Sequence, residues 1–364
     1  MKRAFARADA RARLARWAAV AIVAAVGASP ASAALARPRA DRKLFVNPVL
    51  GAGQDPSVVT NHGWYYYTQS SSDATYITIR RSRSIKSLAA APRIVVWRGT
   101  WAGSPCCQWW APELHEIDGR WYIYAAADDG GNAEHRLEVL GSRRPLGPYR
   151  YLGRLTTPGN FWSIDPSPLR LPDGRLLLFW SGWPAESGQT QNIYVAAMSN
   201  AWTVTGDRVE LSSPTYAWER RSAGLGVNVN ESPEPIIHGS TVSVTYSASG
   251  CWTPNYSLGL LSAHVTANLL SPASWRKSRW PLFQSNRAAG IWGPASNGWF
   301  ASPNGAQTWF VFNAVRDPDG NCGGERQVYA ERVRWSANGT PRLGGKPLPL
   351  RHRLRVPAGD PGRR

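Results

Sequence analysis

The stretch NVNESPEPIIHGSTVSVTYS, residues 228–247, decides how the rest of the chain is interpreted. It contains the carboxylate Glu231, reaches a turn at His238-Gly239 and continues as the alternating run Thr241-Val-Ser-Val-Thr-Tyr246. Alternation of apolar and polar residues is the period of a half-buried strand. The stretch therefore predicts an acid at the end of one strand, a turn, and a second strand packed beside it.

The same form, a turn followed by an alternating strand, occurs five times. The first large residues of these strands are Trp64, Trp121, Leu176, Val242 and Trp309, spaced by 55–67 residues. A short Pro-containing segment precedes each, at residues 54–58, 110–114, 164–168, 230–234 and 293–297. Room remains between repeats for two further strands, such as 192–198 and 258–265. About four strands per repeat in a radial array predicts an all-β, five-bladed β-propeller.

The composition supports an all-β fold. The chain has 364 residues with 19 Trp, 34 Gly and 28 Pro, and it has no long helical stretches beyond the N-terminus. An ordinary β-sandwich also has recurrent turns, but it does not need a Pro-containing segment at one phase of every repeat. We assign the propeller to residues 34–350 and a basic, flexible tail to residues 351–364.

The N-terminus has the pattern of a secretory signal peptide over residues 1–33. A basic start is followed by an apolar run at residues 17–26 and by the small residues Ala31-Ser32-Ala33. The alternative, a membrane anchor, needs a longer apolar run of roughly 20 residues. We expect cleavage, export and no membrane span.

The net charge of +18 makes the chain strongly basic. Residues 1–33 hold six basic residues and one acidic residue, so the chain without them carries about +13. No nucleic-acid-binding motif accompanies this charge, and we expect a monomer without a nucleic-acid partner that adheres to acidic surfaces or polysaccharides.

Four cysteines, Cys106, Cys107, Cys251 and Cys322, remain in the exported chain. They allow three pairings, one of them between the adjacent Cys106 and Cys107. A metal cluster is disfavoured because the chain lacks CxxC spacing with a His partner. We expect structural disulfides and leave their connectivity open.

Carboxylates occupy the segments that a propeller would bring together at one end of its axis. Asp55, Asp165 and Glu231 do so most plainly, Glu113 holds the corresponding place in the second repeat, and the fifth repeat has no acid there. Cleavage of a glycosidic bond needs one protonated and one ionised carboxyl group, which such crowding can provide.

Tryptophans flank these acids. Trp110 lies just before Glu113, Trp162 before Asp165, and Trp292 before the fifth segment. Their broad apolar faces suit stacking on sugar rings, although most of the tryptophans are expected in the blade cores. The three therefore join Glu113 as candidate substrate-binding residues.

The sequence resembles glycoside hydrolase family 43, in its secreted α-L-arabinofuranosidase-like branch, from about residue 47 to 343. The resemblance is carried by Asn47-Pro-Val-Leu50 with Asp55-Pro56, Trp110-Ala-Pro-Glu-Leu-His115, Gly119-Arg-Trp-Tyr-Ile-Tyr124, His135-Arg136, Ser163-Ile-Asp165, Asn230-Glu231 before Pro233, Tyr246-Ser-Ala-Ser249 and Asn255-Tyr-Ser-Leu-Gly-Leu-Leu261. It implies a five-bladed propeller and an inverting hydrolase. It also implies that Asp55 is the general base, Glu231 the general acid, and Asp165 the group that orients Glu231 and tunes its pKa.

Two positions depart from the family pattern. Ser232 follows the general acid where relatives usually have Gly, and Ser296 stands where they often carry a His that helps to hold a central metal ion, commonly calcium. We therefore expect no metal ligands and no required cofactor, with calcium as the alternative. Arg326 is a further candidate for contact with substrate.

The resulting expectation is a secreted, exo-acting α-L-arabinofuranosidase on plant polysaccharide or oligosaccharide. A β-xylosidase or an endo-arabinanase on the same fold is the second interpretation, because the shape of the loops cannot be read from the sequence. A non-catalytic carbohydrate-binding propeller is the third. The retained acids argue against it, and Ser296 argues mildly for it.

Overall fold

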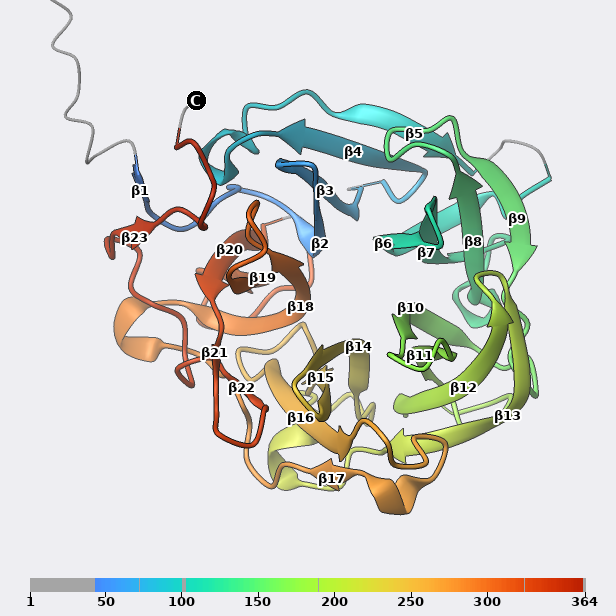
Figure 1. Ribbon diagram of the computed structural model, residues 1–364. Helices are drawn as coiled ribbons and strands as arrows, with labels where there is room; N and C mark the ends of the chain where they lie inside the picture. The colour runs from blue at the N-terminus through green and yellow to red at the C-terminus, as the bar shows by residue number, and fades with distance from the viewer. Residues whose placement is uncertain (1–42, 72, 100–102, 189, 324, 363–364) are drawn as a thin grey trace, which may run out of the picture. The chain divides into compact units, whose positions relative to one another are not determined.

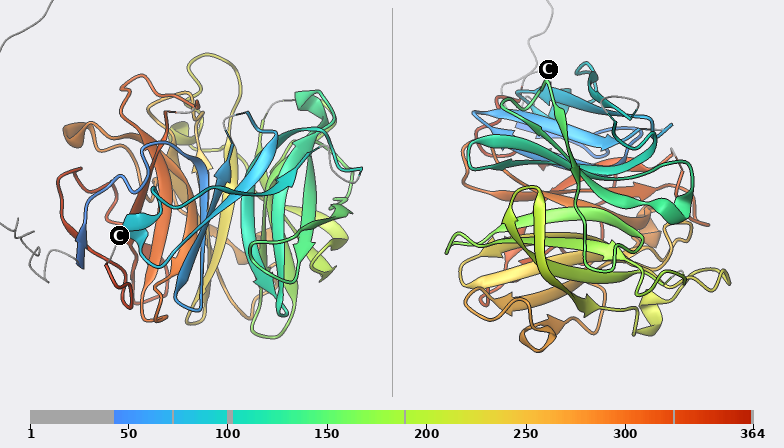
Figure 2. Two further views of the ribbon diagram at one scale, coloured as in Figure 1. Left: turned by 90° about the horizontal axis from the view of Figure 1, so that it is seen from above. Right: turned by 90° about the vertical axis from the view of Figure 1, so that its right-hand side faces the viewer.

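Five blades of antiparallel β-strands surround a central axis, which confirms the predicted five-bladed propeller (Figure 1). The computed structural model describes residues 43–71, 73–99, 103–188, 190–323 and 325–362. The predicted signal peptide, residues 1–33, lies outside these residues. The side views show the long strands of different blades running in similar directions through the propeller (Figure 2).

Each blade is a meander in which strands pair in chain order from the axis outward. The blades are blade I, β2 (Gln54–Asn61), β3 (Trp64–Ser70), β4 (Tyr76–Ser82) and β5 (Ile94–Arg98); blade II, β6 (Cys107–Ile117), β7 (Arg120–Asp128), β8 (Arg136–Ser142) and β9 (Arg150–Arg154); blade III, β10 (Ser163–Arg170), β11 (Leu176–Gly182), β12 (Asn192–Asn200) and β13 (Thr203–Ser212); blade IV, β14 (Asn230–His238), β15 (Thr241–Ala248), β16 (Ser257–His264) and β17 (Arg276–Lys277); and blade V, β18 (Trp292–Ala301), β19 (Thr308–Val315) and β20 (Gln327–Arg332). The five Pro-containing segments thus fall on the innermost strands.

The remaining regular elements are short. They are the paired strands β1 (Leu44–Phe45) and β23 (Leu354–Arg355), the paired strands β21 (Arg334–Trp335) and β22 (Pro341–Arg342), and 3-10 helices at Ile85–Ser87, Asn132–Glu134, Ala217–Glu219, Pro272–Ser274 and Arg287–Ala289. Among the described residues, no helix has the length and apolar character needed to cross a membrane.

The turns between innermost and second strands follow from local sequence. His62 and Gly63 connect β2 to β3, and Asp118 and Gly119 connect β6 to β7. All four residues have positive φ, between 47° and 73°. Positive φ at both central residues is the type I′ geometry that matches the twist of a tight hairpin, and Gly adopts it without steric cost. These turns start the second strand immediately, as the alternation predicts.

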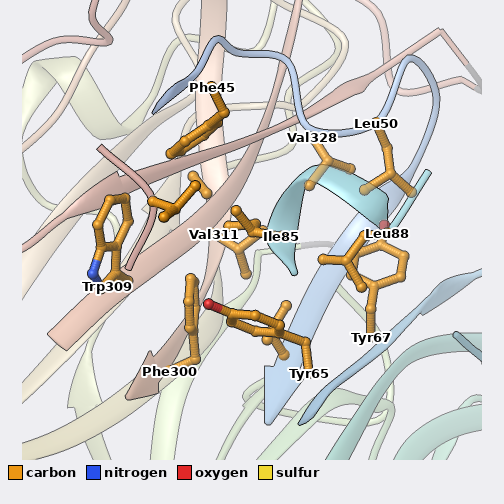
Figure 3. Close-up of a cluster of buried hydrophobic side chains, with 13 residues drawn as sticks. Phe45, Leu50, Tyr65, Tyr67, Ile85, Leu88, Phe300, Trp309, Val311 and Val328 are labelled. Atoms are coloured by element: carbon orange, nitrogen blue, oxygen red, sulfur yellow. The ribbon is translucent and has the colours of Figure 1, made fainter. Parts of the chain in front are cut away.

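The ring closes between the N-terminal segment and blade V. Leu50 forms an antiparallel bridge with Val328 of β20, and the Asn47 side chain exchanges hydrogen bonds with the backbone of Ala330. A buried cluster that includes Leu50, Tyr65 and Trp309 fills the space between blades I and V (Figure 3). Burial of apolar side chains from both ends of the chain therefore joins the first blade to the last.

The C-terminal residues differ from the flexible tail that their basic composition suggests. β23 pairs with β1, and Asp360 is 1% exposed. Its Oδ2 accepts hydrogen bonds from the Tyr65 hydroxyl at 3.0 Å and from the Ile85 N–H at 2.8 Å. The chain from Leu354 is thus held by β1 and by the buried carboxylate of Asp360, whereas residues 351–353 are exposed. A count of basic residues does not reveal this difference.

Replacing Asp360 by alanine is expected to destabilise the fold by about 2–4 kcal/mol, because a buried hydroxyl and a buried N–H lose their acceptor. Chemical denaturation followed by tryptophan fluorescence measures the change. Alanine at the exposed Asp319 is the matched control. A loss below about 0.5 kcal/mol for Asp360→Ala would show that the tail is not docked in this way.

Candidate active site

A bulge in each innermost strand shapes the axial end of the propeller. The residue at the bulge has a positive φ of 43–56° although it is not Gly, and the five residues are Asp55, Ala111, Asp165, Ser232 and Ser296. Such bulges re-aim side chains, and strained φ values are often found at functional sites. Asp55 and Asp165 therefore occupy equivalent positions in their blades.

The bulge positions show that the four acids predicted to be equivalent, Asp55, Glu113, Asp165 and Glu231, do not occupy equivalent positions in their strands. Glu231 lies one residue before the bulge position, which Ser232 holds in blade IV. In blade II, Ala111 holds that position, and Glu113 follows it by two residues. The sequence pattern could not reveal this offset because a bulge adds one residue to a strand and reverses the side-chain alternation beyond it.

A cavity of about 610 Å³ opens at this end of the axis. Of the predicted site residues, it is lined by Asp55, Glu231, Asp165, Trp110, Trp162 and Arg326. Glu113 and Trp292 are not among its described lining residues. Glu113 lies deeper along the axis, and Trp292 packs under the guanidinium of Arg287, 5.5 Å from its ring centre.

Asp55 is held by a cation and a hydroxyl. Nη1 of Arg326 lies 3.2 Å from its Oδ1, and the Ser70 hydroxyl donates to its Oδ2 at 2.9 Å. Arg326 also donates to Gln54 at 3.1 Å. Because a charged donor and a neutral donor each take one oxygen, the carboxylate has a fixed orientation and its negative charge is offset.

Glu231 and Asp165 are two buried carboxyl groups whose pKa values are both raised. Burial raises the pKa of Glu231 to about 7, against a lowering by the Tyr256 hydroxyl, which donates to its Oε1 at 2.7 Å. Burial, together with Glu231 and Asp55, raises the pKa of Asp165 well above its ordinary value. The Ser232 N–H and hydroxyl donate to Asp165 Oδ2 at 2.9 and 3.2 Å. These two donors stabilise the charged form of Asp165, but burial and the neighbouring carboxylates outweigh them and its pKa stays raised.

Tyr256 connects Glu231 to the fifth blade. Its hydroxyl lies 2.9 Å from Oγ of Ser296, whose own N–H donates to Ser247 Oγ at 2.9 Å. Tyr256 belongs to one of the stretches that carry the family resemblance, but nothing in its spacing indicates contact with the acid. Ser296, singled out as a departure from the family, thus supports the hydroxyl that holds Glu231.

Below the cavity lies a second carboxylate pair, Glu113 and Glu234. Burial and the neighbouring Glu113 raise the pKa of Glu234 well above its ordinary value. Nε2 of His115 lies 2.8 Å from Oε2 of Glu113. Only a small space of about 20 Å³ separates these acids from the bulge residues. Glu234 is therefore directed away from the main cavity, where Glu231 lies.

The described side chains around the axis do not fit a metal site formed by protein ligands. No group of three or more His, Cys, Asp or Glu side chains is placed to hold a metal ion in the part of the chain that the structure describes. Ser296 Oγ is engaged with Tyr256 and lies 3.4 Å from Ser232 Oγ. Calcium usually takes six to eight oxygen ligands, several of them carboxylates, and the donors present here do not match that set.

Aromatic rings form the walls of the cavity. Trp162 stacks on Trp183, with 5.0 Å between ring centres and a 15° interplanar angle. Trp110 packs on the buried ring of His135 at 3.9 Å. Trp183, which lines the cavity, was not predicted because it follows a second strand, away from the acids in sequence. The walls are thus flat, apolar and held by neighbouring rings, which suits stacking on a sugar.

The cysteines form two disulfides, Cys106–Cys107 and Cys251–Cys322. The second bond joins residues 71 apart in the chain and both of its cysteines line the cavity. It links the loop after β15 to the segment before Arg326. The open connectivity is thereby resolved, and one bridge fixes two loops at the rim of the site.

Comparison with known proteins identifies the family. The family described as Glycosyl hydrolases family 43 matches residues 45–341. The chain belongs to glycoside hydrolase family 43. Family 43 comprises enzymes that act on O-glycosyl bonds, which agrees with a cavity that contains one carboxyl group of raised pKa and one arginine-bound carboxylate.

Relatives within family 43 include arabinofuranosidases. The chain is 35% identical over 322 residues to "Alpha-L-arabinofuranosidase 43" of Humicola insolens, covering 85% of this chain and 66% of the relative. It is 35% identical to "Extracellular exo-alpha-(1->5)-L-arabinofuranosidase" of Streptomyces avermitilis, covering 84% of this chain and 64% of the relative. The chain therefore spans slightly less than two thirds of these two proteins. The crystal structure of an α-L-arabinofuranosidase from Lactobacillus brevis matches with a TM-score of 0.77 and 30% identity, covering 85% of this chain and 98% of that one.

Proposed function

We propose that the protein is an exported, inverting, exo-acting α-L-arabinofuranosidase that removes terminal arabinose from plant polysaccharide or oligosaccharide. One observation carries the proposal: Glu231, whose pKa is raised to about 7, shares a cavity with Asp55, which an arginine holds. The names of the relatives support the sugar, and two of them are described as extracellular. Export rests on those names and on the signal-peptide pattern of residues 1–33.

The reaction uses the two carboxyl groups on opposite sides of the sugar. Asp55 removes a proton from water, whose oxygen forms a bond to the anomeric carbon. Glu231 gives its proton to the glycosidic oxygen as the bond between that oxygen and the anomeric carbon breaks. Asp165, whose carboxyl group the N–H and hydroxyl of Ser232 hold in place, orients Glu231 and tunes its pKa.

The cavity walls bind the sugar that reacts. Trp110 and Trp162 provide stacking faces, and Arg326 anchors Asp55 close to the substrate. A sugar stacked on these rings excludes solvent from the reacting bond. The loops at the rim, linked by Cys251–Cys322, limit which leaving group is accepted.

A panel of aryl glycosides tests the proposed sugar. Release of aryl alcohol from α-L-arabinofuranoside at least about tenfold faster than from β-xyloside is the expected result. Branched and linear arabinan then separate exo from endo action through the size of the first products. Faster release from the xyloside, or internal cleavage of arabinan, would replace this proposal with the second interpretation. Sugar binding without hydrolysis would favour the third.

Replacement of Tyr256 by phenylalanine is expected to move the alkaline limb of kcat/KM to higher pH by about half to one unit. The Tyr256 hydroxyl bonds the charged form of Glu231 and lowers its pKa, so its loss raises that pKa above about 7. A higher pKa keeps the general acid protonated, and active, to higher pH. An unchanged or lowered alkaline limb would show that Glu231 is not the titrating acid.

Removal of divalent ions is expected to leave kcat/KM unchanged within about twofold, because the donors around Ser296 do not form a calcium site. The measurement compares the enzyme before and after treatment with chelator and desalting. Loss of activity that added calcium restores would contradict a metal-independent reaction.

A further inference from the structure

A second hollow lies at the other end of the propeller from the acids. It has a volume of about 660 Å³ and is bordered by Arg120, Ser142 and Arg150 of blade II and by Trp202 of blade III. Arg120 follows the turn where β6 ends, whereas the acids lie near the starts of the innermost strands. The hollow therefore lies between the outer parts of blades II and III, whose strands can be followed in Figure 1, and is separate from the cavity that holds Glu231.

An exposed aromatic platform forms one side of this hollow. Trp202 is 44% exposed and stacks on Tyr122, with 6.2 Å between ring centres and an interplanar angle of 30°. Its backbone N–H donates to Asn200 at 2.9 Å, which holds the turn between β12 and β13. Leu152, 41% exposed, adds apolar surface to the lining. A supported tryptophan with a free face is a suitable surface for stacking on a sugar ring.

Four arginines, Arg120, Arg143, Arg144 and Arg150, lie around this platform, and all are exposed. Within the described residues, none of them forms an ion pair with a carboxylate. The carboxylates on neighbouring segments are already engaged, since Asp118 pairs with Arg170, and Glu138 with Arg154. The hollow thus has an uncompensated positive charge, which raises the local concentration of anions.

We propose that this hollow is a second carbohydrate-binding site, and that its ligand is an acidic polysaccharide of the polyuronate class. The sugar ring stacks on Trp202, and the carboxylates of successive sugars pair with the surrounding arginines, whose planar guanidinium groups bind carboxylates through two hydrogen bonds. A neutral arabinose polymer would leave all four guanidinium groups without a counter-charge. The choice of a polyuronate over another polyanion rests on the proposed function as a plant-polysaccharide enzyme.

Binding at this hollow leaves the catalytic cavity free. The two sites face opposite ends of the propeller, so a chain held at one does not block the other. The consequence is retention of the enzyme on acidic material while terminal arabinose is removed elsewhere in the same material. Hydrolysis of a small aryl glycoside, which is too short to engage the hollow, is independent of it.

Affinity electrophoresis through gels that contain polygalacturonate tests the proposal on the full chain. Trp202→Ala and the double variant R143A/R144A are each expected to weaken retention at least about fivefold, with hydrolysis of aryl arabinofuranoside unchanged. Trp280→Ala is the matched aromatic control, because Trp280 is 70% exposed and lies 5.7 Å from the guanidinium carbon of Arg279. R332A/R334A is the matched charge control, and neither control is expected to alter retention more than about twofold.

Three results would overturn the proposal. Equal weakening by R332A/R334A would mean that the overall positive charge binds the polymer. Equal retention by neutral arabinan gels would contradict an acidic ligand, and equal retention by single-stranded DNA through Trp202 would assign the hollow to nucleic acid. Since retention is measured without turnover, a failure here is distinct from a failure to hydrolyse arabinofuranosides.

Discussion

Replacing Glu231 by alanine is expected to lower kcat/KM for an arabino-oligosaccharide by roughly 10²–10⁴-fold, the usual contribution of a general acid. Glu231 combines a raised pKa with a hydrogen bond from Tyr256 in a cavity lined by tryptophans. Without it, the glycosidic oxygen leaves as an alkoxide. Initial rates at substrate concentrations well below KM give the ratio directly.

The leaving group distinguishes loss of the acid from general damage. A dinitrophenyl arabinofuranoside needs no protonation to depart, so Glu231→Ala should hydrolyse it with a much smaller loss than the oligosaccharide. Glu234→Gln is the matched control, because Glu234 lies below the cavity and its pKa is raised, a shift that favours the neutral form that glutamine imitates. Equal losses on both substrates, or a larger loss in Glu234→Gln, would exclude Glu231 as the proton donor.

Replacing Asp55 by alanine is expected to lower kcat/KM by roughly 10²–10⁴-fold on both substrates. The base acts on water, so the quality of the leaving group does not relieve its loss. Asp55→Asn is the informative companion, because the amide oxygen can still accept from Arg326 and the NH2 group can donate to the Ser70 hydroxyl, but the amide cannot take a proton. It should therefore fold normally and be as inactive as the alanine variant.

Ser70→Ala tests whether the position of the Asp55 carboxylate matters, because it leaves that carboxylate in place. It removes one donor to Asp55 and also the acceptor of the Ala111 N–H, and a loss of roughly tenfold is expected from a misplaced carboxylate. Activity in Asp55→Asn within tenfold of the unmodified enzyme would refute the assignment of Asp55, whatever the result for Ser70.

The blades could be predicted because hairpins leave strong local signals. His62-Gly63 and Asp118-Gly119 have the positive φ that tight turns need, and alternating strands follow them directly. The packing of the C-terminus could not be predicted, because it depends on a hydrogen bond between Asp360 and Tyr65, which are 295 residues apart in the sequence. A contact of that kind has no local pattern, while the basic residues beside it resemble a solvated tail.

The proposed catalytic acids could be placed at the axial end from the sequence, but their positions relative to the bulges could not be predicted. The bulges at Asp55, Asp165 and Ser232 are backbone features, and they move Glu231 by one residue relative to the other two acids. The same effect places Glu113 below the cavity with Glu234. The role of Tyr256 could not be predicted, because its hydroxyl reaches Glu231 from just before the start of β16, past the intervening strand β15. No local sequence pattern indicates such a contact.

Proton NMR of the first product formed from an aryl α-L-arabinofuranoside tests directly whether the reaction inverts the anomeric centre. β-L-Arabinofuranose is expected to be released first and to convert to the α-anomer only by mutarotation, because Asp55 directs water to the face opposite the proton on Glu231. Release of the α-anomer first, or no release of arabinose, would contradict this expectation.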